Sequence, residues 1–286
     1  VRRQGVDEVI LAYSDLPHAE VMHKASLVLA SGADFKLMGP KSTYLKSKVP
    51  VIAICAVRTG AGKSTVTRRI ARILKNKGIK LVAVRHPMPY DPNLASQAVQ
   101  RFATIDDMDA ARCTIEEREE YEPHISMGTI VYAGVDYERI LRQAEKEAQI
   151  ILWDGGNNDM PFFTPDLMIT VADALRPGQE AGSYPGETNV IMSEAVVINK
   201  VDVAKKEDVE LVKANIKKLN PRAQIIEAKS TIKVDRPELV KGKRVLVIED
   251  GPTVTHGQTP YGAGTVAAKN MNAKIVDPHP YATGSI

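Results

Sequence analysis

The sequence predicts a doubly wound parallel α/β sheet flanked by two shorter α/β units. Three observations predict this class. Apolar segments of strand length alternate with segments of helical periodicity along most of the chain, as expected for parallel strands joined by helices. The apolar run at residues 51–57 is nearly continuous, which is typical of a strand covered on both faces. A glycine-rich loop at residues 58–65 joins that strand to a strong amphipathic helix.

Composition limits the function classes. The 286 residues are 44% hydrophobic and 26% charged, which suits an ordinary globular protein. The net charge of +3 arises from basic and acidic residues mixed along the chain, so we expect no nucleic-acid partner. No apolar run reaches the roughly 18 residues of a membrane span, so we expect no membrane partner. Cys55 and Cys113 lack the spacing of a zinc site or a disulfide framework, which favours a reducing, cytoplasmic location.

The segment 1–45 reads as the C-terminal part of an N-terminal Rossmann-like domain. Residues 8–13 have the pattern of a short buried strand, residues 18–31 that of a helix, and residues 34–38 that of a second strand. The lysine- and serine-rich segment 41–48 is expected to be a linker. The chain starts without methionine almost inside a strand-like run and ends just after a glycine-rich turn, so both ends look cut.

A central domain is expected over residues 46–240. Its predicted helices lie at about residues 63–77, 105–121, 136–148 and 205–219. Its strands after the first are expected at residues 80–84, 150–153, 167–171, 195–198 and 224–227. A new strand at residues 245–249 begins what we interpret as the start of a C-terminal α/β unit, residues 241–286.

The loop after the first central strand has the residues of a phosphate-binding loop. Glycines let backbone N–H groups surround an anion, and the N-terminus of the next helix adds partial positive charge. Lys63 is expected to contact the β- and γ-phosphates, and Ser64 to bind Mg²⁺ through its hydroxyl. A plain glycine-rich turn with a surface lysine is the alternative. The expected nucleotide contacts are Thr59, Gly60, Ala61, Gly62, Lys63, Ser64 and Thr65. With this loop, the predicted sheet is that of a P-loop NTPase, flanked by truncated Rossmann-like α/β units.

The start of the loop departs from the usual form. Val57 stands where Gly or Ala is usual, and the remaining residues resemble the variant loop of a dimerising P-loop class that includes Min-type ATPases and metal-insertion GTPases. In that class a basic residue reaches the partner's phosphates, and Arg58 holds its position here. The resemblance implies a homodimer in which Arg58 is catalytic. The alternative is that Arg58 contacts only its own phosphates or solvent.

Asp154 ends the predicted strand 150–153, where folds of this kind place the carboxylate that orders Mg²⁺. A turn-forming aspartate is the alternative. The glycine pair that follows would let the backbone approach a γ-phosphate. The residues expected to contact a second substrate or the attacking water are Asn157, Asn158 and Asp159.

Asn199, Lys200 and Asp202 follow a predicted strand and resemble the base-reading motif of GTPases. A carboxylate at Asp202 would accept two hydrogen bonds from guanine that adenine does not donate. We expect Asn199 to brace the loop and the stem of Lys200 to stack along the base. Ala228 and Lys229 stand where GTPases place their last base-contacting loop.

Three further segments are candidates for substrate contacts. Arg85 and His86 end a predicted strand at the edge where open α/β sheets bind ligands, and we expect them to hold a phosphate or carboxylate. Plain surface positions are the alternative. The aperiodic segment 176–187 is expected to be a long loop of lid type. Residues 253–265 are interpreted either as a second anion-binding loop or as a plain connection.

Five segments together resemble archaeal cyclic 2,3-diphosphoglycerate synthetase and the predicted GTPases related to it. They are residues 13–16, 39–40, 58–65, 153–159 and 255–257. The resemblance covers nearly the whole chain and implies ATP-dependent formation of a phosphoanhydride on 2,3-diphosphoglycerate. The Asn-Lys-Val-Asp string at residues 199–202 departs from that synthetase, which favours the predicted GTPases.

The motifs predict a Mg²⁺-dependent enzyme that binds GTP, or ATP, for hydrolysis or for phosphoryl transfer to a small anionic metabolite. Lys63, Arg58 and Asp154 are the expected catalytic residues. The first alternative is the ATP-dependent synthetase itself. The second is a GTP-driven switch or delivery protein that acts on a protein partner.

Overall fold

The computed structural model describes residues 2–88, 94–95, 97–156, 159–249, 261–277 and 280. The chain divides into two compact units, Val1–Ala228 and Lys229–Ile286. Within the described ranges, every helix is either too short or too polar to cross a bilayer.

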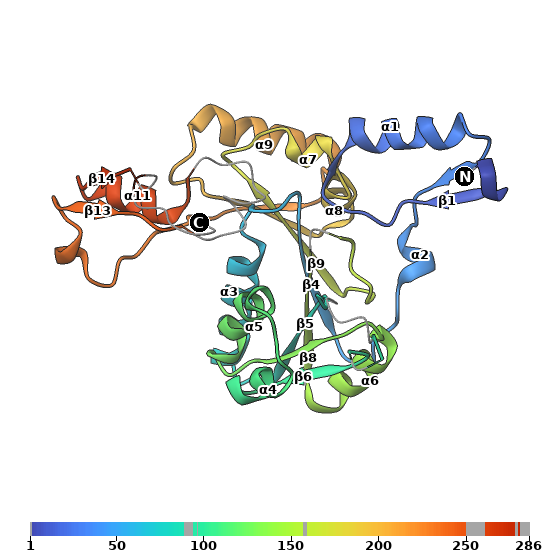
Figure 1. The fold of residues 1–286 in the computed structure, drawn as a ribbon, viewed down its shortest axis with the longest axis horizontal. Helices are drawn as coiled ribbons and strands as arrows, with labels where there is room; N and C mark the ends of the chain where they lie inside the picture. The colour runs from blue at the N-terminus through green and yellow to red at the C-terminus, as the bar shows by residue number, and fades with distance from the viewer. Residues whose placement is uncertain are drawn as a thin grey trace. The chain divides into compact units, whose positions relative to one another are not determined.

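An eight-stranded sheet with the order β12-β11-β9-β4-β8-β5-β7-β6 forms the centre of the larger unit (Figure 1). Neighbouring strands are parallel except for β6 and β7. The strands are β4 (Val51–Ala56), β5 (Leu81–Arg85), β6 (Gln100–Phe102), β7 (Ile130–Ala133), β8 (Ile150–Gly155), β9 (Leu167–Asp173), β11 (Ala195–Asn199) and β12 (Gln224–Glu227). β4 lies inside the sheet between β8 and β9, so its carboxyl end opens onto the crevice between neighbouring strands.

Helices cover both faces of this sheet. They are α3 (Lys63–Asn76), α4 (Ile105–Ala110), α5 (Ile115–Ile125), α6 (Tyr137–Glu147), α7 (Gln179–Gly182), α8 (Gly186–Met192) and α9 (Lys206–Leu219). Side chains of β4 alternate between the faces: Ile54 packs with Ala71 of α3 and Val212 of α9. Ala53 packs in a separate cluster with Ile140 of α6. The predicted doubly wound parallel sheet is confirmed.

The N-terminal segment contains the predicted βαβ element. Its elements are a short 3₁₀ helix η1 (Arg2–Gln4), β1 (Glu8–Ile10), β2 (Leu16–Pro17), α1 (His18–Leu29), β3 (Asp34–Lys36) and α2 (Pro40–Thr43). β1 and β3 are parallel neighbours, and β2 pairs in antiparallel with β10 (Ser183–Tyr184). The expectation of a plain linker at 41–48 is wrong, because α2 occupies its start and Leu45 bridges to Phe163 and packs on the core.

Two other expectations about the larger unit need correction, and two strands were missed. The helix predicted at 105–121 is two helices, since Thr114 accepts the backbone N–H of Glu117 and starts α5 with a capping box. The segment 176–187 is not a plain loop but contains α7, β10 and the start of α8. β6 and β7 were not expected at all, because strands of three or four residues give little periodicity.

The smaller unit is an α/β element. It contains a 3₁₀ helix η2 (Pro237–Leu239), β13 (Arg244–Leu246), α11 (Ala263–Asn270) and β14 (Lys274–Val276). β13 and β14 are parallel neighbours, so the expected strand–helix pattern is present here. Most of the loop 253–265, with its suggested anion site, lies outside the described residues.

Candidate active site

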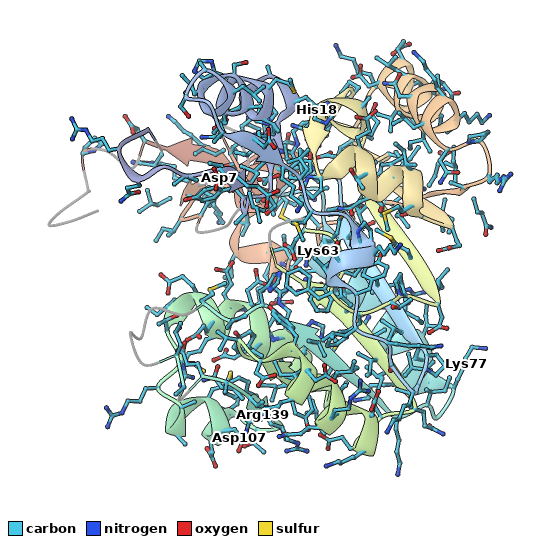
Figure 2. The ribbon with its side chains drawn as sticks, turned by 90° about the vertical axis from the view of Figure 1, so that its right-hand side faces the viewer. Asp7, His18, Lys63, Lys77, Asp107 and Arg139 are labelled. Atoms are coloured by element: carbon cyan, nitrogen blue, oxygen red, sulfur yellow. The ribbon has the colours of Figure 1, made fainter. Side chains whose placement is uncertain are left out.

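The phosphate loop leaves the carboxyl end of β4 and leads into α3. Gly60 and Gly62 have φ values of 82° and 106°, which residues with side chains rarely adopt. Gly62 is the N-cap of α3, and its helix start has no side-chain cap. Figure 2 shows Lys63, the first residue of α3, inside the unit and Lys77, just past the end of α3, at its periphery. The first turn of α3 thus has the form of an anion-binding helix start.

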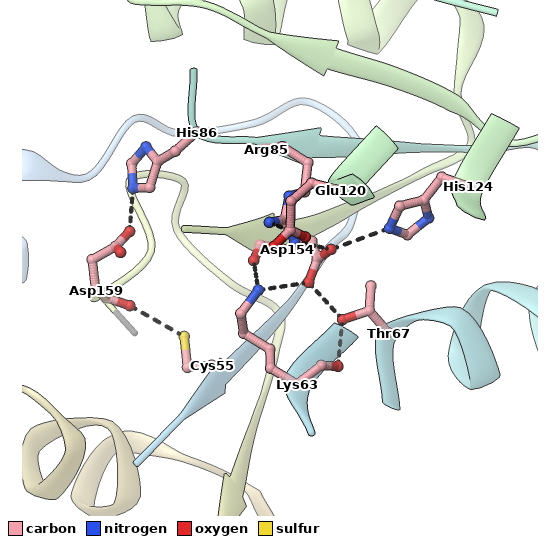
Figure 3. Close-up of polar contacts among 9 residues, drawn as sticks. All are labelled: Cys55, Lys63, Thr67, Arg85, His86, Glu120, His124, Asp154 and Asp159. Carbon is pink, nitrogen blue, oxygen red and sulfur yellow. Dashed lines mark hydrogen bonds and ion pairs between the residues drawn. The ribbon is translucent and has the colours of Figure 1, made fainter. Parts of the chain in front are cut away.

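Asp154, in β8, is the centre of a buried polar network (Figure 3). Its side chain is fully buried. Oδ1 accepts hydrogen bonds from Lys63 Nζ at 2.9 Å and from Thr67 Oγ1 at 2.8 Å. Oδ2 accepts from Arg85 Nη1 at 2.6 Å and lies 3.1 Å from His124 Nε2. The Lys63 ammonium also donates to the main-chain carbonyl of Asp154. Segments α3, β5 and α5 therefore converge on one carboxylate.

The ionisation of this network follows from its charges. Burial by itself raises the pKa of a carboxyl group, but Arg85 and Lys63 hold the pKa of Asp154 well below its ordinary value. Arg85 is buried as well, and burial favours its neutral form. The carboxylates of Asp154 and Glu120 nevertheless raise the pKa of Arg85, whose Nη2 lies 2.5 Å from Glu120 Oε2. Both partners of the Asp154–Arg85 pair are therefore charged at neutral pH.

The residues present suit a Mg²⁺ ion that is bound mainly through phosphates and water. Ser64 is half-buried in the first turn of α3. A carboxylate offers about four lone-pair sites, and the four contacts of Asp154 use them in this conformation. In the described ranges no cluster of three His, Cys, Asp or Glu side chains is placed to hold a metal. A metal role for Asp154 therefore requires Lys63 to leave it.

Residues from two strand ends fix the backbone of the phosphate loop. Asn199 Nδ2 donates to Ala61 O at 2.9 Å, and Lys200 Nζ donates to Gly60 O at 2.8 Å. Lys200 Nζ also donates to Asp173 Oδ2 at 2.8 Å. Asn199 therefore contacts the phosphate loop, and its role in bracing the base-reading loop stays a prediction. The ammonium of Lys200 reaches the loop itself, while its stem remains a proposed base contact.

Two loop-bracing residues were missed by the sequence analysis. Asp173 ends β9 and is buried, and Arg176 donates to its Oδ2 at 2.8 Å and to Thr59 O at 2.7 Å. Asp173 ends an apolar strand, as Asp154 nearly does, so the same rule would have found it. Arg176 lies in the segment that we interpreted as a lid, where no pattern pointed to it.

The remaining base-contact candidates lie around the end of β11. Asp202 is exposed in the turn after that strand. Ala228 donates its backbone N–H to Ile198 O at 2.8 Å, and its carbonyl accepts the N–H of Val201 at 3.2 Å. The chain therefore brings Ala228 beside the Asn199–Asp202 segment. Lys229 begins the smaller unit.

Arg58 is paired within its own chain. Its Nε lies 3.7 Å from Asp15 Oδ1, and the same oxygen accepts the backbone N–H of Thr59 at 3.1 Å. Asp15 has a φ of 62°, unusual for a residue with a side chain. It precedes β2, which pairs with β10. The sequence analysis gave Asp15 no role at the loop, because the contact joins segments that are far apart in the chain.

The candidate substrate residues divide into two groups. Arg85 is almost fully buried on Asp154 and Glu120, so the alternative of a plain surface position does not apply to it, and its contact with a substrate stays a prediction. His86, the next residue, is partly exposed and contacts the carboxylate of Asp159. Asn157 and Asn158 lie outside the described residues.

Relatives cover the whole chain. Arginine synthetase ArcE of Thermococcus kodakarensis is 59% identical over 287 residues, which is 100% of this chain and 64% of that protein. Cyclic 2,3-diphosphoglycerate synthetase of Thermococcus sibiricus is 29% identical over 269 residues, 86% of this chain and 59% of that protein. This chain thus spans less than two thirds of each relative. The resemblance to the cyclic 2,3-diphosphoglycerate synthetase type is confirmed.

A family model and solved structures also match. The model of the CobW/HypB/UreG nucleotide-binding domain matches residues 138–227. The hydrogenase maturation factor HypB of Archaeoglobus fulgidus is 17% identical with a TM-score of 0.41, over 74% of this chain and 89% of that chain. LpxK of Aquifex aeolicus, in complex with ATP, is 11% identical with a TM-score of 0.47, over 80% and 72%.

Proposed function

Because this chain is homologous along its full length to Arginine synthetase ArcE, we propose that it is a synthetase that transfers the terminal phosphoryl group of a nucleoside triphosphate to a small anionic acceptor. The observation that carries the proposal is the position of Lys63. Its ammonium stands at the mouth of a phosphate loop and is held by Asp154 from the neighbouring strand β8. This is the arrangement needed to neutralise charge on a transferred phosphoryl group.

Lys63 would exchange its partner when a nucleotide binds. Its ammonium would turn from Asp154 to the β- and γ-phosphates, while Arg85, His124 and Thr67 keep Asp154 hydrogen-bonded. The buried carboxylate would then lose one of its four contacts and remain paired with Arg85. The network thus allows Lys63 to move without leaving a buried charge alone.

Ser64 and Asp154 are the proposed residues for Mg²⁺. The Ser64 hydroxyl would hold the ion directly, and the lone pair that Lys63 vacates on Asp154 would orient a water of the metal shell. The ion supplies further neutralisation of the phosphate oxygens when it is bound. Arg58 would add a guanidinium on the other side of the loop, fixed by Asp15.

The base would be read by the segment after β11. Asn199 already ties this segment to the phosphate loop, and Asp202 is exposed three residues later. We propose guanine as the preferred base because an exposed carboxylate can accept hydrogen bonds from its N1–H and N2–H groups. Competition calorimetry with GTP and ATP tests this: preferential GTP binding that weakens in Asp202→Asn is expected. Saturation by ATP without competition from GTP would remove the guanine assignment and leave phosphoryl transfer in place.

A homodimer remains part of the proposal, on the resemblance of the loop to the dimerising class. The Asp15–Arg58 contact favours action of Arg58 on its own nucleotide, so dimerisation need not complete the site. Light scattering with and without nucleotide and Mg²⁺ tests the oligomeric state. A mass that stays at one chain under both conditions would remove the dimer from the proposal.

The main experiment tests phosphoryl transfer itself. We expect Lys63→Ala to weaken nucleotide binding and abolish turnover, while Lys77→Ala, at the far end of α3, matches the parent protein. Turnover is measured as nucleoside diphosphate formed from the triphosphate with water, and as triphosphate formed from diphosphate and phosphate with L-arginine. Arginine is the probe because the relative's name makes it a product, and an enzyme catalyses its reaction in both directions. Full turnover in Lys63→Ala would refute the proposal.

A further inference from the structure

His86, Asp159 and Tyr137 form a chain of polar contacts that the phosphate loop and the base-reading segment do not use. His86 follows β5, Asp159 comes after β8, and Tyr137 is the first residue of α6. His86 Nε2 contacts Asp159 Oδ2, and His86 Nδ1 contacts the Tyr137 hydroxyl. Figure 3 shows the first of these contacts beside Lys63 and Asp154. His86 thus holds the carboxylate of Asp159, and Tyr137 in turn holds His86.

Packing fixes the imidazole of His86. Its ring makes edge-type contacts with Tyr137, Trp153 and Phe162, with ring centroids 5.6, 5.5 and 5.2 Å away. A side chain at Gly156 would run into the same ring, so the backbone passes close beside it. Trp153 is buried, which keeps water from this side of the ring. His86 therefore has little freedom to turn away from Asp159.

The charge states suit a base rather than an acid. Burial raises the pKa of a carboxyl group, but the hydrogen bond and charge of His86 together with Lys63 keep the pKa of Asp159 below its ordinary value. Burial raises the pKa of the Tyr137 phenol, so that group stays neutral. Asp159 is therefore an ionised carboxylate whose side chain is 18% exposed, so it is not fully enclosed.

Asp159 also lies close to the reacting end of the phosphate loop. Its pKa responds to the charge of Lys63, the residue that is to meet the γ-phosphate. Its main-chain carbonyl accepts from the thiol of Cys55 at 3.6 Å, and Cys55 belongs to β4, the strand that leads into the loop. The backbone of Asp159 therefore lies against β4, and Figure 3 shows its side chain in the same group of polar residues as Lys63.

We propose that Asp159 is the general base for the acceptor, and that His86 and Tyr137 are positioning residues for it. This inference rests on the proposed phosphoryl transfer. The acceptor class is a small molecule, or water, whose attacking oxygen or nitrogen carries a proton. In the step, the attacking atom bonds to the γ-phosphorus and its proton moves to Asp159. The bond from phosphorus to the β,γ-bridging oxygen breaks, and the diphosphate leaves with the electron pair.

The test compares nucleotide binding with turnover in the full chain. Water serves as the acceptor probe, with nucleoside triphosphate and Mg²⁺. Asp159→Asn is expected to bind nucleotide like the parent protein and to lose turnover about 100-fold. The fall of kcat toward acidic pH in the parent protein should disappear in this variant, because the base must be deprotonated. Asp159→Glu should recover part of the rate. Glu138→Gln on α6, whose side chain is 60% exposed, is the matched control.

Substitutions of the positioning residues His86 and Tyr137 should differ from Asp159→Asn in turnover and in the pH profile. His86→Gln keeps an N–H donor and should lose turnover about 10-fold, while His86→Leu and Tyr137→Phe should also move the acidic limb of the pH profile. Parent-like turnover and pH profile in Asp159→Asn, with turnover abolished in Lys63→Ala, would overturn the role of Asp159 and leave the proposed function standing. Equal turnover in Lys63→Ala and the parent protein would overturn both.

Discussion

Asp154 is a fully buried carboxylate whose charge is matched mainly by Arg85. Replacing it with asparagine leaves the Arg85 guanidinium paired only with Glu120, at the edge of the network. We expect Asp154→Asn to lower the free energy of unfolding by about 3–5 kcal/mol at neutral pH. Urea unfolding measures the change. Glu210→Gln, whose side chain is 69% exposed in a surface pair, is the control and should change stability little.

The Asp154–Arg85 ion pair also predicts how the folding stability changes with pH. Because the folded-state pKa of Asp154 is depressed, its contribution is fully present above its unfolded-state pKa and is lost as pH falls through the folded value. The difference in stability between the parent protein and Asp154→Asn should therefore be constant near neutrality and shrink in acid. A difference that stays constant down to acid unfolding would contradict the assigned ion pair.

Asp15 and Arg58 are expected to act as one unit. The carboxylate of Asp15 holds both the Arg58 guanidinium and the N–H of Thr59, so either substitution disturbs the same piece of the loop. We expect Arg58→Ala to lower kcat about 100-fold with a smaller effect on nucleotide affinity. Asp15→Asn should lower kcat less, and the double variant should be no slower than Arg58→Ala. Additive losses in this double-mutant cycle would show that the two residues act separately.

Single residues differ in how well sequence reasoning placed them. The motifs after two strands pointed to Lys63 and Asn199, and the structure brings both residues to the phosphate loop. The burial of Arg85 was not foreseen, because the glutamate and aspartate partners that bury it come from α5 and β8. Asp15 was missed for a similar reason. Patterns of local spacing carry no information on which distant charges will pair.

At the scale of elements, the turn into α3 depends on glycine geometry. Gly62 and Gly78 both have positive φ, but only a side chain at Gly62 would overlap the Asn199 amide; at Gly78 nothing lies within 4 Å. Gly78→Ala should therefore cost about 1 kcal/mol of backbone strain. Gly62→Ala should cost more and weaken nucleotide binding at least 10-fold, because Asn199 loses its place on the loop. Thermal unfolding and nucleotide titration distinguish the two variants; equal effects would exclude the steric role of Asn199.

Long elements were predictable and short ones were not. α3 and α9 each have 14 residues and a clear apolar face, so periodicity located them within about one residue. α7 and β10 have four and two residues, and tertiary contacts hold them. Ser183, for example, donates its hydroxyl to Val57 O at 2.6 Å. Contacts of this kind join residues that are far apart in the chain, and no local pattern predicts them.

The whole larger unit follows one topological rule. Strands β5, β8, β9 and β11 run parallel with β4, so the residues at their carboxyl ends meet at one edge of the sheet. That rule predicted a site containing Lys63, Asp154 and Asn199 before any contact was known. It did not predict the antiparallel edge strand β6 or the pairing of β2 with β10, since these strands have only two or three residues and run antiparallel to their partners.

Asn199 and Lys200 join the segment after β11 to the phosphate loop through the carbonyls of Ala61 and Gly60. If that segment reads the base, as we propose, base binding would act on the residues that hold the loop in place. Phosphate and base affinities would then be coupled, and coupling between two sites is reciprocal. Binding of a free nucleoside would order this segment in advance and so raise the affinity for pyrophosphate. Pyrophosphate would raise the affinity for the nucleoside by the same factor. The identity of the base would in this way affect how firmly the loop holds the phosphates that react.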